Sequence, residues 1–108
     1  MVKETLKKIE KTVQEAPQAS DDTKEELLGL LRELRTELEV LESTHAEEAR
    51  HIASFTERAT HESTRPAAPH AEEARAGLSE AVVQFEATHP KLGSLVRAIC
   101  DSLAAMGI

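Results

Sequence analysis

A row of leucines in the front half of the chain constrains the fold more than any other feature. Five leucines follow one another at spacings of four, three, four and three residues: Leu27, Leu31, Leu34, Leu38 and Leu41. Residues at this spacing lie on one stripe of an α-helix, which has about 3.6 residues per turn. Leu28 and Leu30 widen the stripe, and a wide apolar face is typical of a bundle core. The row therefore predicts a helix that contacts more than one other helix.

A shorter apolar row precedes the leucines. It has the same spacing and consists of Val2, Leu6, Ile9, Val13 and Ala16. Pro17 ends this predicted helix, because a residue before proline disfavours the helical conformation. The connection PQASDD has the length usual between antiparallel helices, and Asp22 and Glu25 have the spacing of a capping box. Residues 1–42 are therefore predicted to form an N-terminal helical hairpin.

The middle of the chain is poor in large apolar side chains. Between Glu42 and Gly77 the only ones are Ile52 and Phe55. If the leucine spacing continues, the apolar stripe of the helix extends through the following residues: His45, Glu48, Ile52, Phe55 and Ala59. A second possible phase turns inward Ala46, Ala49 and Ala53. We predict that the second helix continues as one long helix, and that residues 43–69 form a polar helical arm with few partners, followed by a proline-containing loop.

The last third of the chain predicts a second helical hairpin over residues 70–108. Its first helix, expected over 71–88, has a buried face of Ala71, Ala74, Leu78, Val82 and Phe85. Pro90 fits the first position of the next helix. The apolar stripe of that helix consists of Leu92, Val96, Ile99, Leu103 and Met106.

Together the patterns predict an all-α protein, a single helical domain over residues 1–108 built from helical hairpins. Small chains that are short of core usually add a partner subunit. Because the leucine face has too few partners within the chain, we expect coiled-coil or bundle-like self-association into a homodimer or higher oligomer. The expected interface consists of Leu27, Leu31, Leu34, Leu38, Leu41, Leu95, Ile99, Leu103 and Met106.

The hexapeptide HAEEAR occurs twice, at residues 45–50 and 70–75. The next large apolar residues follow at different offsets, Ile52 at seven residues after His45 and Leu78 at eight after His70. One residue of offset is about 100° around a helix, so the copies need not face their cores alike. We therefore expect a copied solvent-facing segment, dispensable in its first copy, and no repeated ligand site.

Two pairs of residues have the Glu-x-x-His spacing of di-iron carboxylate bundles, Glu48 with His51 and Glu86 with His89. A chain with seventeen glutamates and five histidines produces such pairs by accident. A metal-binding helical bundle is therefore the alternative hypothesis. The favoured prediction is that the chain holds no metal, no other cofactor and no catalytic residue.

Charge and composition exclude several other functions. The net charge is −7, without a basic block for nucleic-acid phosphates or an anionic membrane. The charged N-terminus does not resemble a secretory signal, so we expect a cytoplasmic protein. The one cysteine, Cys100, lies in an apolar stretch and is expected to be a buried thiol. The function we expect is a non-enzymatic, self-associating structural or protein-interaction module.

The C-terminal sequence QFEATHPKLGSLVRAICDSLAAMGI combines a Phe-Glu pair, a His-Pro turn and an apolar helix that ends in Met-Gly-Ile. The residues concerned are Phe85, Glu86, His89, Pro90, Leu92, Leu103, Met106, Gly107 and Ile108. This combination resembles the signature end of the domain of unknown function 4404 family, a group of short bacterial proteins. Residues 26–41 resemble the front half of the family, whereas residues 43–76 look like an expansion. The resemblance implies a helical fold and no catalytic residue.

Overall fold

The computed structural model describes residues 2–17, 19–64 and 70–106. Within these ranges the chain forms five α-helices and one short 3₁₀-helix. The α-helices are α1 (Val2–Gln14), α2 (Asp21–Glu42), α3 (Ala46–Thr64), α4 (Ala71–Val82) and α5 (Pro90–Met106), and the 3₁₀-helix is η1 (Val83–Phe85). The all-α prediction is confirmed. Pro66, Pro69 and the terminal Gly107-Ile108 lie outside the described residues.

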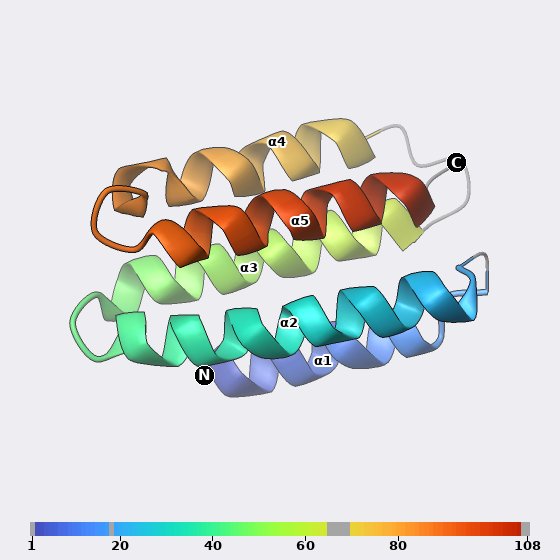
Figure 1. Cartoon of the computed structure of the whole chain (residues 1–108), viewed down its shortest axis with the longest axis horizontal. Coiled ribbons are helices and arrows are strands. Elements are labelled where there is room, and N and C mark those ends of the chain that lie inside the picture. Colours follow the sequence, from blue (N-terminus) through green and yellow to red (C-terminus); the bar gives the residue numbers. More distant parts are fainter. Residues whose placement is uncertain (1, 18, 65–69, 107–108) are drawn as a thin grey trace.

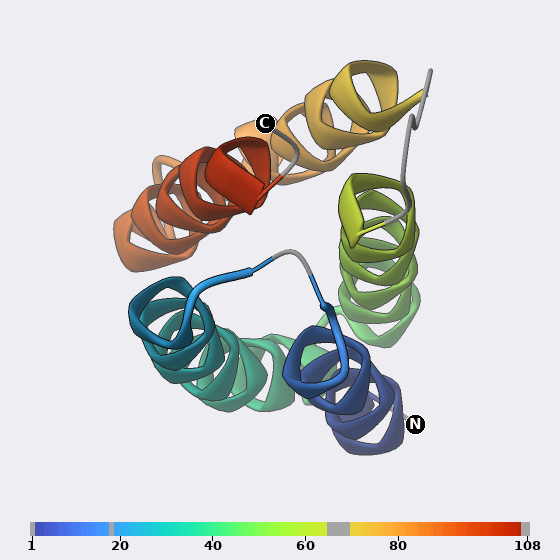
Figure 2. The same ribbon diagram turned by 90° about the vertical axis from the view of Figure 1, so that its right-hand side faces the viewer.

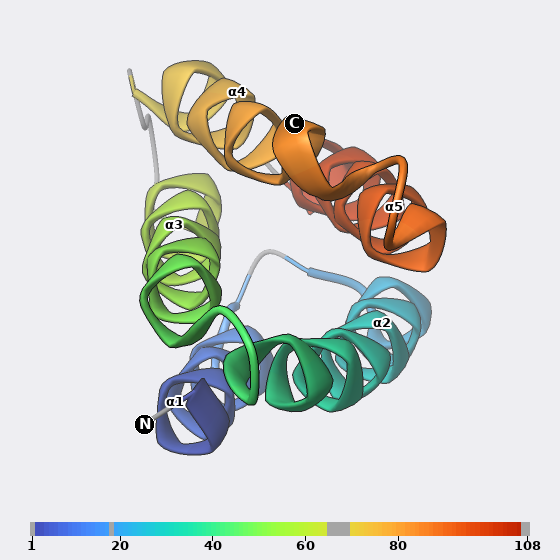
Figure 3. The ribbon, with the colours of Figure 1, turned by 90° about the vertical axis from the view of Figure 1, so that its left-hand side faces the viewer.

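The helices surround one core in the ring order α1, α2, α5, α4, α3 (Figures 1, 2 and 3). Each helix packs against its two neighbours in the ring, and α3 also contacts α2 and α5. The bundle measures 37 × 22 × 20 Å. The sequence predicted that the segment containing α3 is a polar arm with few partners. This prediction is wrong, because α3 packs against all four other α-helices. None of the helices described here is long and apolar enough to cross a membrane.

The first hairpin is fixed by a cap that differs from the expected one. Ser20 is the N-cap of α2, and its Oγ accepts a hydrogen bond from the backbone N–H of Thr23 at 3.2 Å. The capping box expected at Asp22 is therefore wrong, and Asp22 lies in the first turn, where a negative charge stabilises the helix dipole. Lys24 Nζ donates to the carbonyl of Gln14 at 3.2 Å, which connects the end of α1 to the start of α2.

The predicted single long helix is interrupted after Glu42. Ser43 Oγ donates to the carbonyl of Val40 at 2.7 Å, and Thr44 Oγ1 donates to the carbonyl of Leu41 at 3.3 Å. Serine and threonine hydroxyls that bond nearby carbonyls offer the backbone an alternative to further helix. The chain turns here, and α3 runs back along α1 and α2 (Figure 1).

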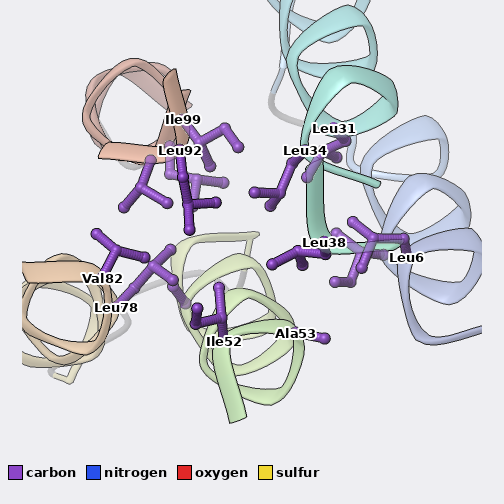
Figure 4. Packing of buried hydrophobic residues seen from close by; sticks show 14 of the residues in the cluster. Leu6, Leu31, Leu34, Leu38, Ile52, Ala53, Leu78, Val82, Leu92 and Ile99 are labelled. Carbon is purple, nitrogen blue, oxygen red and sulfur yellow. The ribbon is translucent and has the colours of Figure 1, made fainter. Parts of the chain in front are cut away.

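The leucine row lies inside this ring. Leu31, Leu34 and Leu38 point toward the centre of the bundle, where they meet side chains of α3, α4 and α5 (Figure 4). All nine residues expected at a subunit interface are buried within the single chain, with exposed fractions between 0% and 6%. The premise that one chain cannot cover its leucine face is therefore wrong. In this fold these side chains offer no surface to a second copy.

Small side chains explain how α3 joins the core. Its buried residues are Ala49, Ile52, Ala53, Thr56, Ala59, Thr60 and Ser63. Thr56 Oγ1 donates to the carbonyl of Ile52 at 2.7 Å, and Thr60 Oγ1 donates to that of Thr56 at 2.8 Å. These bonds satisfy both hydroxyls within the helix, so their burial leaves no unpaired donor. Ala49 and Ala53 of the alanine phase are buried, and Ala46 is partly buried. Of the continued leucine phase, Ile52 and Ala59 are buried, whereas His45 and Phe55 are exposed, so the buried face combines parts of both phases.

A pair of substitutions at Thr60 tests this close packing. Thr60→Leu adds volume at a residue that is 1% exposed and is expected to lower the free energy of unfolding by about 1–3 kcal/mol. Thr60→Val keeps the shape and removes a hydroxyl whose acceptor is an ordinary helix carbonyl, so we expect a change below about 1 kcal/mol. Urea denaturation of both variants measures the difference. Equal, small effects would contradict close packing at this position.

Candidate functional site

The two HAEEAR copies have the same structural role. His45 and His70 each precede a helix, and each carbonyl accepts the first helical hydrogen bond, from Ala49 at 3.0 Å and from Ala74 at 2.9 Å. Both alanines are buried, with exposed fractions of 0% and 7%. The two glutamates of each copy lie in the first turn, where they favour the helix dipole. The copies therefore face the core alike, and the expectation of different orientations is wrong.

The Phe-Glu and His-Pro residues form a turn at one end of the bundle. The ring of Phe85 is buried between two histidines, with ring centroids 5.4 Å from His45 and 6.2 Å from His89 in edge-to-face geometry. Glu86 Oε1 accepts a hydrogen bond from Arg97 Nη1 at 2.9 Å. This turn begins α5 at Pro90, as predicted, and α4 ends earlier than predicted, at Val82, because the chain continues as η1. Its contacts are those of a packing element.

The residues of the alternative metal hypothesis lie on different elements. On α3, Glu48 is partly buried and His51 is exposed. At the turn before α5, the Glu86 carboxylate is bonded to Arg97 and the His89 ring packs on Phe85. Across the described ranges, no three His, Cys, Asp or Glu side chains lie close enough together to hold a metal ion.

Cys100 lies on α5, contacts α4 and is partly buried. Its Sγ is 3.6 Å from Ser79 Oγ and 3.6 Å from the carbonyl oxygen of Arg75. Burial raises the pKa of the thiol, and the negative charge of Asp101 adds to this effect. The hydrogen bond from Ser79 and the positive charge of Arg75 oppose it. A thiol with a raised pKa is a poor nucleophile at neutral pH, which fits a packing role.

This shift predicts slow alkylation of Cys100. Near pH 8, iodoacetamide is expected to react more slowly with the native protein than with the urea-unfolded chain, because the thiolate fraction is lower in the fold. The same shift stabilises the fold below the ordinary thiol pKa of 9.0, and this contribution is lost as the pH rises through the raised pKa. Mass spectrometry of the alkylated fraction measures the rate. An equal or faster native rate would contradict the raised pKa.

An open groove of about 320 Å³ lies between α3 and α4. Phe55 is 37% exposed and contributes one wall, and the floor includes Gly77. An ideal Cβ on Gly77 would lie 3.5 Å from the Phe55 ring, which is van der Waals contact, so the ring lies directly over the glycine. The full lining is Phe55, Arg58, Glu73, Ala74, Ala76, Gly77 and Glu80. A concave apolar floor with charged edges is a suitable contact surface for one apolar side chain.

A second groove, also of about 320 Å³, lies on the other side of α3, against α1. Its lining is Ile9, Thr12, Ser54, Glu57, Arg58, Thr60 and His61. The hydroxyls of Thr12 and Thr60 already donate to helix carbonyls, at 3.1 and 2.8 Å. Ile9 and Thr60 are buried beneath its edge, so this groove presents mostly polar and charged groups to a ligand.

The sequence patterns did not predict that Phe55 and Gly77 line a surface groove. The continued leucine spacing placed Phe55 on the inner seam, whereas the chain turns at residues 43–45 and the buried face of α3 combines Ala49 and Ala53 with Ile52, leaving Phe55 outside it. A phenylalanine that lies outside a helical stripe of alanine and isoleucine is the signal that would have indicated an exposed aromatic ring. Gly77 gave no such signal, because its role depends on the neighbouring helix.

The family comparison covers most of the bundle. The model of a family described as Domain of unknown function (DUF4404) matches residues 30–108. The matched range begins inside α2 and includes α3, α4 and α5, whereas α1 lies outside it. Comparisons with curated proteins and with solved structures gave no match. Since the family model covers well over half of its length, the chain belongs to the domain of unknown function 4404 family.

Proposed function

We propose that the protein is a non-enzymatic protein-interaction module whose contact surface is the groove between α3 and α4. The observation that supports this proposal is the exposure of Phe55. The chain has only two phenylalanines, and one of them lies on the surface beside a glycine-floored groove. Large aromatic side chains beside a pocket are frequent anchors of protein interfaces.

The groove is held by the core beneath it. Ile52 of α3 and Leu78 of α4 are fully buried and lie side by side in the core between the two helices (Figure 4). A partner therefore meets a preformed surface, and less conformational entropy is lost on binding. Since the nine residues first expected at a subunit interface are buried, self-association would also have to use an outer surface of this kind.

The test compares two exposed apolar residues. Phe55→Ser removes the groove wall, and Val40→Ser, on α2, removes a side chain that is 59% exposed and does not line the groove. Affinity capture from cells of the native organism is expected to recover the same partner with the wild type and with Val40→Ser, and to lose it with Phe55→Ser. Light scattering of the three proteins checks whether the partner is a second copy.

A partner captured equally by Phe55→Ser would contradict the groove as the contact surface. Circular dichroism must show that both variants remain helical. Val40→Ser should change the free energy of unfolding by less than about 1 kcal/mol, whereas Phe55→Ser should lower it by about 1–2 kcal/mol, because most of the Phe55 side chain is buried.

A further inference from the structure

The groove between α3 and α4 carries charges whose arrangement specifies a partner. Glu73 and Glu80 lie on its rim on either side of Gly77, and both are exposed. Their separation of seven residues corresponds to about 10.5 Å along the axis of α4. In the described part of the chain, Glu80 forms no ion pair within 4.0 Å, and Glu73 is 3.6 Å from His70 alone. Two carboxylates are therefore available on one edge.

The opposite edge of the groove carries a positive charge. Arg58 of α3 lines it and has no carboxylate within 4.0 Å among the residues that the structure describes. The apolar floor between the edges is short, because Gly77 lies one helical turn from each glutamate. Along α4 the groove therefore offers a carboxylate on each side of the Phe55 ring, and Arg58 adds a positive charge on the α3 edge.

We propose that the groove binds a basic amphipathic helix of a partner protein. One large aliphatic side chain of that helix packs against the exposed part of the Phe55 ring, which itself lies over Gly77. Two Lys or Arg residues, seven positions apart and about one turn on either side of the aliphatic residue, pair with Glu73 and Glu80. This is the helix-in-groove mode of recognition, with charge complementarity setting orientation. The inference rests on the proposed function and adds the chemistry of the partner.

The proposed contact is small, and its size predicts the affinity and the salt dependence of binding. A single inserted side chain and two exposed ion pairs predict weak and transient association. Because the pairs are exposed, salt weakens them, so the affinity should fall as the ionic strength rises.

The experiment uses the full chain and a synthetic probe. The probe is a fluorescein-labelled, alanine-rich helical peptide with lysines seven positions apart and one leucine between them. Fluorescence anisotropy at low salt is expected to show saturable binding that weakens at high salt. Peptides with glutamate in place of lysine, or with serine in place of leucine, are expected to bind at least about tenfold more weakly.

Matched variants locate the site. Replacing both rim carboxylates, Glu73→Lys with Glu80→Lys, is expected to weaken probe binding at least about tenfold. The same charge change on α2, Glu25→Lys with Glu39→Lys, is expected to leave binding within about twofold, because both residues are exposed and lie outside the groove. Gly77→Val places methyl groups where the Phe55 ring now lies and should displace the ring, which should also weaken binding. If Gly77→Val fails to fold, Phe55→Ser replaces it.

Three results would overturn the inference. One is an equal affinity for the lysine and glutamate peptides, and another is equal weakening by the α2 pair, which would indicate nonspecific attraction to an acidic chain. The third is a dimer that dissociates in Gly77→Val, which would assign the groove to a second copy. In each case, partner capture that depends on Phe55 would leave the proposed function intact, so the two failures are distinguishable.

Discussion

Leu34→Lys is expected to unfold the protein. Leu34 has an exposed fraction of 0% and lies at the centre of the bundle (Figure 4). The substitution removes a packed side chain, a loss of about 2–5 kcal/mol when leucine becomes alanine, and introduces a charge with no partner. Domains of this size are stable by about 5–15 kcal/mol in total. Circular dichroism is expected to show a chain that is mostly unfolded at room temperature.

The control for this prediction lies on the same helix. Val40→Lys introduces the same charge at a side chain that is 59% exposed, and is expected to change the free energy of unfolding by less than about 0.5 kcal/mol. A Leu34→Lys protein that stays helical and only loses oligomer mass in light scattering would contradict the single-chain core. It would indicate instead that the leucine face lies between subunits.

Deleting Ala46–His70 is expected to abolish the fold, although the sequence alone suggested that this segment is dispensable. The deletion removes all of α3, which packs against four other helices. The buried Ile52 side chain accounts for about 2–3 kcal/mol, and the uncovered faces of α1 and α4 add to the loss. The sum is comparable with the whole stability of a domain. Circular dichroism and light scattering should report an unfolded or aggregated product.

The matched control keeps α3 and changes only its outer face. Replacing His51, Ser54 and Glu57 with alanine alters three exposed residues and raises helix propensity, so this variant is expected to remain folded. A deletion product that is as helical and as cooperative in urea as the control would show that α3 is an arm after all.

Much of the fold is predictable from the spacing of large apolar residues. The rows of α1, α2 and α5 repeat every three or four residues, and a helix can bury such a stripe only against other helices. Pro90 likewise indicates the start of α5, since its fixed backbone angle suits the first turn. These features are local, so the sequence carries them directly.

The role of α3 is not predictable in this way. Its buried face consists of alanine, threonine and serine around one isoleucine, and these residues read as surface when only large apolar side chains are counted. Their burial depends on the close approach of α1 and α4, and on threonine hydroxyls that bond within the helix. The turn at residues 43–45 also replaced the expected long helix, so the phase of α3 could not be extended from α2.

The groove depends on the same long-range arrangement. Phe55 and Gly77 are far apart in sequence and meet only because α4 packs beside α3. The duplicated HAEEAR gave a partial indication, since it begins both helices in the same register and buries the equivalent alanine in each. The interpretation of the repeat as a solvent-facing segment was wrong, because one alanine of each copy is buried in the core.

Native-state hydrogen exchange of α3 tests the central claim most directly, since the packing of α3 both closes the core and forms one wall of the groove. The amides of Ile52, Thr56 and Thr60 are the positions to follow, with Leu34 of α2 as the reference. If α3 belongs to the core, these amides should exchange with opening free energies close to that of Leu34 and to global unfolding. Exchange of the three α3 amides at the rates of an unstructured peptide, while Leu34 stays protected, would contradict it.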